Sequence, residues 1–354
     1  MSGATTDAPK APEGTLDPTT FAVIFNAMSS CVAEMSLTFE YSAWSSIVTE
    51  ARDFSCAVYD AAFPPNALCV LDGLPIFVNS QPVALEETAK FFGAEEICDG
   101  DIIVLNSPYY GGTHVGDLVV VCPVFSEGEH LFWAAATGHH MDIGSAWNTS
   151  VPVYAPDAFG EGLHIPPLKL EERGKLRRDV LNLFLENVRY HDFVEGDLMS
   201  QVGSVKTARK RLLELVDKWG ADTPRQFSAD IVAYADRRMR DEIATWPGGT
   251  YSGDAWIDSG GQGNENLRVA RTMTVERTEV TLDLSGSDPQ ARAGVNSSWA
   301  CCRNSATIPV LCCLDPDIPH NQGCHGHIRV VAPKGDACQR RVAGGDSGGG
   351  DRAR

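Results

Sequence analysis

The sequence predicts an α+β fold in which mixed, largely antiparallel β-sheets pack against long helices. Apolar residues recur at helical spacing after residue 17 and again between residues 178 and 246. Between residues 53 and 124 the pattern changes to short apolar runs separated by turn residues, which is typical of strands. Strand-like alternation returns between residues 250 and 284. Strands and helices therefore come in separate runs, as they do in α+β proteins.

Capping residues and apolar spacing mark the helices. Asp17 followed by Pro18 predicts a helix start, because aspartate is a favoured N-cap and proline is tolerated in the first turn. This first helix should continue to about Ser45. Further helices are predicted at residues 85–92, 178–188, 198–219, 227–246 and 296–313.

Short apolar runs between turn residues predict the strands. They lie at residues 56–59, 68–71, 75–78, 102–105, 118–124 and 131–137, followed by an antiparallel sheet within 250–284 and a last strand at 328–331. A polar turn centred on Glu127 and Gly128 joins the runs 118–124 and 131–137, which should form a hairpin. The proline-rich residues 151–167 should form an ordered loop.

Length and charge bound the class of protein. The 354 residues are 43% hydrophobic, enough to bury a large core, and the formal net charge of −18 disfavours nucleic acid or an anionic membrane as partners. No run reaches the roughly 18 consecutive apolar residues of a membrane span. Residues 1–15 and 335–354 are predicted to be a disordered lead-in and a disordered low-complexity tail. We therefore expect a cytoplasmic protein with one domain at residues 16–334, and its eleven cysteines should be reduced and mostly buried.

The two ends of the predicted hairpin carry side chains that bind metals. His114 and Asp117 lie in a glycine-rich loop just before the first strand, and His139 follows the second. Counting back from the turn places Asp117 roughly opposite Gly138, so the three side chains should converge. Two imidazoles and a carboxylate can hold a metal ion and leave positions open for water or substrate. We therefore predict a metal centre at His114, Asp117 and His139.

Two further carboxylates are candidates for catalysis. Asp53 precedes the strand at 56–59, and it could act as a base or fourth ligand, or simply pair with Arg52. Asp142 could act as a base or support the metal ligands. His140 is a weaker ligand candidate than its neighbour, because successive residues of a strand point to opposite faces.

The sequence carries no signature of nucleotide binding. The glycines at 260–263 are not followed by the Lys-Ser/Thr of a phosphate loop, so these residues are predicted to form a flexible loop. No Gly-x-Ser-x-Gly elbow of a serine hydrolase is present either. A reaction that needs ATP would have to obtain it through another subunit.

Several longer stretches resemble the hydantoinase B/oxoprolinase family, which includes N-methylhydantoinase B subunits and is related to the alpha subunit of acetone carboxylase. They follow the family's order over roughly residues 16–334. The stretches are DPTTF (17–21), RDFSCA (52–57), LNSPYYGGTH (105–114), GHHMDIG (138–144), EGLHIPPLKL (161–170), NVR (187–189), GDL (196–198) and LDPDIP (314–319).

This resemblance implies the metal-binding subunit of an ATP-dependent amidohydrolase, which opens the C–N bond of a cyclic amide such as a hydantoin, 5-oxoproline or another lactam. It implies one divalent ion, zinc or manganese, at the positions of His114, Asp117 and His139. ATP would bind only to a hydantoinase A-like partner in a hetero-oligomer. The alternatives are a subunit of an ATP-dependent ketone carboxylase of the acetone or acetophenone type, and a non-catalytic truncated remnant.

The chain departs from the family pattern at three places. Ser107 stands where the family commonly has aspartate, and no histidine lies near residues 73–77, where the family often has them. Both departures disfavour hydantoin itself as the substrate. The pattern stops near Lys334, which predicts a C-terminally truncated domain.

Overall fold

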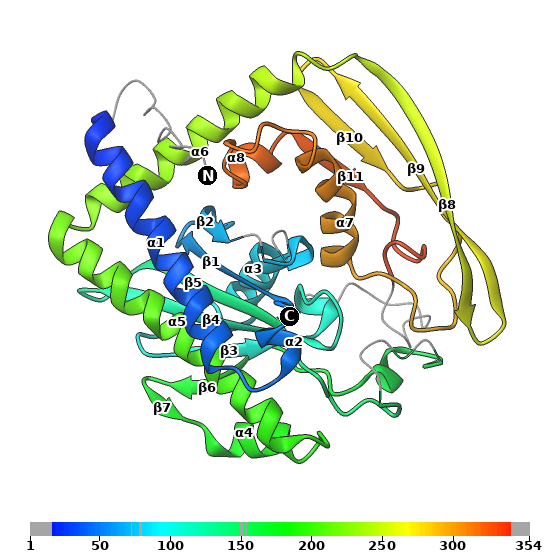
Figure 1. Ribbon diagram of the computed structural model, residues 1–354, viewed down its shortest axis with the longest axis horizontal. Helices are drawn as coiled ribbons and strands as arrows, with labels where there is room; N and C mark the ends of the chain where they lie inside the picture. The colour runs from blue at the N-terminus through cyan, green and yellow to red at the C-terminus, as the bar shows by residue number, and fades with distance from the viewer. Residues whose placement is uncertain (1–15, 72, 78–79, 149–151, 153, 341–354) are drawn as a thin grey trace.

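The computed structural model describes residues 16–340 except 72, 78–79, 149–151 and 153. It contains a seven-stranded and a four-stranded sheet with long helices packed against them (Figure 1). All strand pairs but one are antiparallel, which confirms the α+β prediction. The predicted lead-in at 1–15 and residues 341–354 of the predicted tail lie outside the described residues.

The larger sheet holds the predicted hairpin at its centre. Its strand order is β2-β1-β5-β4-β3-β6-β7. Glu127 and Gly128 turn the chain between β4 and β5 with φ values of 51° and 82°, as in a type I′ hairpin turn. The hairpin and its turn are therefore confirmed. The strands are β1 (Phe54–Asp60), β2 (Ala67–Leu71), β3 (Ile102–Leu105), β4 (Asp117–Ser126), β5 (Glu129–His139), β6 (Leu168–Glu172) and β7 (Lys175–Leu176).

Helices cover both faces of this sheet. Cys56 of β1 lies in the core shared with α1 (Pro18–Ser42) and α5 (His191–Trp219), whereas its neighbour Ala57 lies in the core shared with α3 (Ser80–Phe92). Successive strand residues point to opposite faces, so α1 and α5 cover one face and α3 the other (Figure 1). Burial on both faces explains why these strands are almost continuously apolar.

The first helix begins as its sequence predicts. Asp17 accepts hydrogen bonds from the backbone N–H groups of Thr19 and Thr20, which confirms it as the N-cap. By length and composition, α1 is the one helix of the described chain that could cross a membrane. Its apolar face, including Phe21, Ile24, Met28 and Met35, is buried in the core of this protein.

The smaller sheet belongs to the C-terminal lobe, by which we mean residues 249–340. Its order is β11-β10-β9-β8, with only β10 and β11 parallel. The long helix α6 leads into it, and its Met239 and Ile243 share one core with residues of α7, α8 and β10 (Figure 1). The elements are α6 (Asp222–Ile243), β8 (Gly249–Gly261), β9 (Asn264–Glu276), β10 (Glu279–Asp283), α7 (Trp299–Leu311), α8 (Gln322–His325) and β11 (Ile328–Val331).

The connections contain short helical segments, and one of them corrects a predicted strand. Residues 75–77 form the 3-10 helix η1 (Pro75–Phe77), so the strand predicted at 75–78 is wrong. Pro75 has no N–H to donate to a strand ladder, which favours the turn. The remaining short segments are α2 (Ser46–Thr49), η2 (Pro108–Tyr110), η3 (Ala158–Glu161) and α4 (Arg178–Leu185).

Three helices, α3, α5 and α6, begin earlier than their apolar spacing predicts, and α3 does so at Ser80 rather than at residue 85. α5 begins at His191 rather than Leu198, and it runs through Gly196, although glycine is a poor helix former. A Cβ at that position would lie 2.4 Å from Cγ of Trp44, so the missing side chain lets the indole pack against the helix. α6 likewise begins at Asp222, ahead of the predicted Phe227.

The disordered tail is predicted to begin at residue 335, but the ordered chain continues at least to residue 340. Residues 335–340 are packed against the C-terminal lobe, where Ala337 and Cys338 are buried. The backbone N–H of Ala337 donates to Asp288 at 2.9 Å, and that of Arg340 donates to Ser297 at 3.0 Å. Glycine and arginine content predicted disorder here, but these long-range backbone hydrogen bonds hold the segment in place.

Candidate metal centre

The hairpin brings the three predicted ligands together at its open end. Asp117, the first residue of β4, lies directly opposite His139, the last residue of β5. Asp117 Oδ2 lies 2.5 Å from His114 Nδ1, and Asp117 Oδ1 lies 2.9 Å from His139 Nδ1. The two imidazole rings stack with centroids 4.8 Å apart. One possible ligand atom from each residue lies within 4.8 Å of the other two, the arrangement of a candidate metal site.

A glycine makes room for the two imidazoles. A Cβ on Gly116 would lie 2.7 Å from Cε1 of His139 and 3.2 Å from Nε2 of His114. His139 is buried and hydrogen-bonded to Asp117, so its ring could not move aside freely. The glycine between the two ligands of the loop is therefore required for the stacked pair of rings.

The C-terminal lobe braces the loop that carries the ligands. Thr113 donates a short hydrogen bond from its hydroxyl to Asp117 Oδ2. Ser298 Oγ lies 3.0 Å and 2.9 Å from the carbonyl oxygens of Gly112 and Thr113, which can accept its proton. The same oxygen accepts the N–H of Cys301 as the N-cap of α7. Sequence reasoning missed Thr113 and Ser298 as parts of the site.

Asp117 stays ionised between the two imidazoles although its side chain is buried. Burial alone would raise the pKa of the Asp117 carboxyl, but the imidazoles of His114 and His139 hold it well below its usual range. Burial alone would lower the pKa of His114, and the nearby Asp117 charge outweighs this and raises it. A buried carboxylate that stays ionised against its desolvation cost is a strong attractor of positive charge.

Asp53 lies next to the three ligands but outside their set. Its backbone carbonyl accepts the N–H of His139 at 3.0 Å. Burial raises the pKa of the Asp53 carboxyl, an effect that the charge of His139 opposes. Its Oδ1 is buried and has no hydrogen-bond partner among the described residues. The structure therefore brings Asp53 to the cluster with one carboxylate oxygen unengaged.

His140 and Asp142 face other partners. His140 Nε2 lies 2.8 Å from Gln201 Oε1 on α5, so its ring points away from His139, as the strand pattern predicts. Asp142 accepts hydrogen bonds from the N–H of Gly144 and from both the backbone and the guanidinium of Arg189. The structure thus places Asp142 against Arg189 and leaves it out of the histidine cluster.

Glu161 is a further charged neighbour that sequence reasoning did not single out. Burial lowers the pKa of His114, and the charge of Asp117 has the largest opposing effect. The charge of Glu161 raises the same pKa by a smaller amount. The side chain is buried and pairs with Arg340 at 2.5 Å. Its position inside the stretch EGLHIPPLKL was the only signal in the sequence.

Comparisons with known proteins agree on one family. A hydantoinase B/oxoprolinase family model matches residues 17–341. The chain is 35% identical over 329 residues to the beta chain of the caprolactamase of Pseudomonas jessenii, covering 92% of this chain and 55% of the relative. It is 30% identical over 343 residues to the B component of a putative D-/L-hydantoinase of a Pseudomonas strain, covering 91% and 57%. The chain therefore spans little more than half the length of these relatives.

A solved structure extends the similarity to three dimensions. The crystal structure of the ATP-dependent caprolactamase from Pseudomonas jessenii superposes with a TM-score of 0.88 at 33% sequence identity. The match covers 94% of this chain and 57% of that chain. Sequence and fold thus point to the same relatives.

Proposed function

Because the chain belongs to the hydantoinase B/oxoprolinase family, we propose that it is the metal-binding subunit of an ATP-dependent amidohydrolase that opens a cyclic amide. The observation that carries this proposal is the convergence of His114, Asp117 and His139 at one end of the hairpin. The substrate would be a hydantoin, 5-oxoproline or another lactam. A hydantoinase A-like partner would supply ATP in a cytoplasmic hetero-oligomer.

The donor set fits one divalent ion, and both zinc and manganese accept imidazole and carboxylate ligands. His114, Asp117 and His139 would hold it, since their ligand atoms lie close together and Asp117 stays ionised. Such an ion, when bound, polarises a carbonyl group or lowers the pKa of a water molecule. The hydroxyl of Thr113 fixes the Asp117 carboxylate, so that each of its oxygens faces one imidazole.

Asp53 is the residue that we propose as the base. Its Oδ1 has no partner among the described residues, so it can take a proton from a water molecule and return it to the ring nitrogen that leaves. The raised pKa brings this carboxyl closer to the operating pH, where proton transfer is most effective. Asp142 instead supports the chain after β5, because both of its oxygens are engaged by Arg189 and Gly144.

The proposal is tested by co-expressing the chain with an ATP-binding hydantoinase A-like protein. We expect about one zinc or manganese ion per chain, and lactam hydrolysis only when both proteins and ATP are present. Chelation should stop turnover, and the same metal should restore it. Bicarbonate-dependent consumption of a ketone would favour the carboxylase instead. A metal-loaded complex without turnover would favour a non-catalytic role, and the absence of stoichiometric metal would refute the metal centre.

Asp53→Asn should lower kcat by about 10²–10⁴-fold, the usual contribution of a general base, without loss of bound metal. Wild-type activity should fall as the pH drops through the raised pKa of Asp53, because the protonated carboxyl cannot accept a proton. Asparagine does not titrate, so this acid limb should disappear from the pH–rate profile of the variant. An unchanged profile would rule out Asp53 as the base. Metal analysis of both proteins provides the control.

A further inference from the structure

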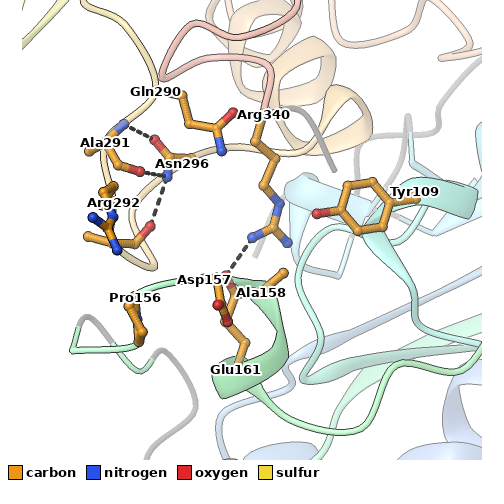
Figure 2. Close-up of a pocket in the computed structure, with 11 residues that line it drawn as sticks. Tyr109, Pro156, Asp157, Ala158, Glu161, Gln290, Ala291, Arg292, Asn296 and Arg340 are labelled. Atoms are coloured by element: carbon orange, nitrogen blue, oxygen red, sulfur yellow. Dashed lines mark hydrogen bonds and ion pairs between the residues drawn. The ribbon is translucent and has the colours of Figure 1, made fainter. Parts of the chain in front are cut away.

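A polar pocket lies between the larger sheet and the C-terminal lobe (Figure 2). We call it the interlobe pocket; its volume is about 300 Å³, enough for a small molecule. One side of the pocket is formed by segments that connect strands of the larger sheet, and it contains Tyr109 of η2 and Asp157 and Glu161 at η3. Gln290, Arg292, Asn296 and Arg340 line it from the C-terminal lobe. The pocket therefore exists only where the two parts of the chain meet.

One wall of the pocket is an ion pair that joins these two parts. Arg340 donates from Nη1 to Glu161 Oε1 at 2.5 Å, and both side chains are more than nine-tenths buried. The guanidinium lies 5.8 Å from the centre of the Tyr109 ring (Figure 2). A guanidinium carries five N–H donors, and within the described chain only one guanidinium nitrogen of Arg340 is hydrogen-bonded. Donors therefore remain for an oxygen of a ligand.

A second guanidinium, that of Arg292, lies at the rim of the pocket on a turn that is held by hydrogen bonds. Arg292 is exposed and has no side-chain partner in the part of the chain that the structure describes. The neighbouring Asn296 accepts the N–H of Ala291 at 2.8 Å and donates to the carbonyls of Ala291 and Ala293 (Figure 2). Arg292 is thus presented by a backbone whose shape is fixed before any ligand binds, which lowers the entropy cost of binding.

The pocket also offers acceptors. Asp157 receives the N–H groups of Phe159 and Gly160 on Oδ1, and its other oxygen has no partner among the described residues. Glu161 also lines the pocket, and its side chain is buried. Ser298, two residues after the lining residue Asn296, lies within hydrogen-bond distance of the carbonyls of Gly112 and Thr113, so the pocket adjoins the loop that carries the proposed ligands. A ligand in this pocket can therefore face carboxylate acceptors and guanidinium donors at once.

We propose that the interlobe pocket selects cyclic amides that carry a carboxylate. Arg292 binds the carboxylate, and the carboxylates of Asp157 and Glu161 accept the N–H of the ring. This inference rests on the proposed function, because it names the substrate class of the same centre. An arginine binds a carboxylate through paired, charge-assisted hydrogen bonds, which an uncharged lactam cannot form. Arg292 is then the residue that determines specificity, and the metal ligands are not involved in that choice.

The test compares two probes that share one ring, 5-oxoproline and the uncharged 2-pyrrolidinone. Titration calorimetry with the full chain, without ATP or partner, should show at least about tenfold tighter binding of 5-oxoproline. Arg292→Gln should remove this preference and leave the affinity for 2-pyrrolidinone unchanged. Arg329→Gln, which replaces an exposed arginine on β11, serves as the matched control and should change neither affinity.

Three outcomes would overturn the inference: equal affinity for both probes, a preference that survives in Arg292→Gln, or no binding of either probe. Because the measurement needs neither turnover nor the ATP-binding partner, its failure is distinct from failure of the proposed function. The latter would show as missing metal or missing ATP-dependent hydrolysis.

Discussion

Asp117→Asn should empty the proposed metal centre and abolish turnover. Metal content should fall from about one ion per chain to below about a tenth, and affinity should fall by more than the 10–100-fold typical of outer-shell changes. Asparagine has nearly the same shape as aspartate but no charge. Asp117 is the acidic member of the cluster and contacts both histidines, so its charge would attract and fix the proposed ion.

The same substitution should change how the stability of the metal-free protein depends on pH. In the wild type, the Asp117 charge raises the pKa of His114 above its ordinary value against the opposing effect of burial. The ion pair of His114 and Asp117 therefore stabilises the fold fully at pH values below the ordinary histidine pKa. This stabilisation is lost as the pH rises through the raised pKa of His114. Unfolding by urea in EDTA should show a larger difference between wild type and variant at pH 5 than at pH 8.

Asp99→Asn provides the matched control, because this exposed carboxylate pairs with Arg209 on the surface. It should keep full metal content and lose at most about 1 kcal/mol of unfolding free energy. Full metal occupancy in Asp117→Asn would refute the assignment of the ligand. A stability difference that grows from pH 5 to pH 8 would contradict the electrostatic account.

The sequence predicts the hairpin and the convergence of His114, Asp117 and His139 well, because local alternation and turn residues determine both. It places Asp117 one position from its true partner. Counting from the turn pairs Asp117 with Gly138, but an irregularity between Val124 and Phe125 shifts the register so that Asp117 lies opposite His139. A shift of one residue moves a side chain to the other face of a strand. Bulges of this kind leave no reliable mark on a single sequence.

The supports of the site could not be predicted, because they come from distant parts of the chain. Ser298 and Thr113 are 185 residues apart, and only the folded arrangement of the C-terminal lobe brings them together. Arg340 lies in a segment whose composition indicated disorder, yet it forms an ion pair with Glu161. Local sequence patterns predict the helices and strands and the residue types at their ends. Contacts between the larger sheet and the C-terminal lobe depend on tertiary packing, which local patterns do not determine.

Asn106→Leu should lower the free energy of unfolding by about 3–5 kcal/mol, a large part of the 5–15 kcal/mol typical of proteins. Asn106 is fully buried and donates from Nδ2 to the carbonyls of Val115 and Leu163, at 2.7 and 2.9 Å. Its Oδ1 accepts the N–H of Ile165 at 2.7 Å. Leucine has a similar volume but no polar atoms, so three buried backbone groups would lose their side-chain partner.

The position of these bonds gives the substitution a second effect. Val115 lies between the proposed ligands His114 and Asp117, so release of its carbonyl would free the loop that holds them. Urea denaturation in EDTA should report the loss of stability, and metal titration under folding conditions should show weaker binding. Asn26→Leu, an exposed asparagine of α1, is the control and should stay within about 0.5 kcal/mol. A loss below about 1 kcal/mol in Asn106→Leu would mean that the metal loop holds its shape without this side chain, and that Ser298 and Gly116 suffice to form it.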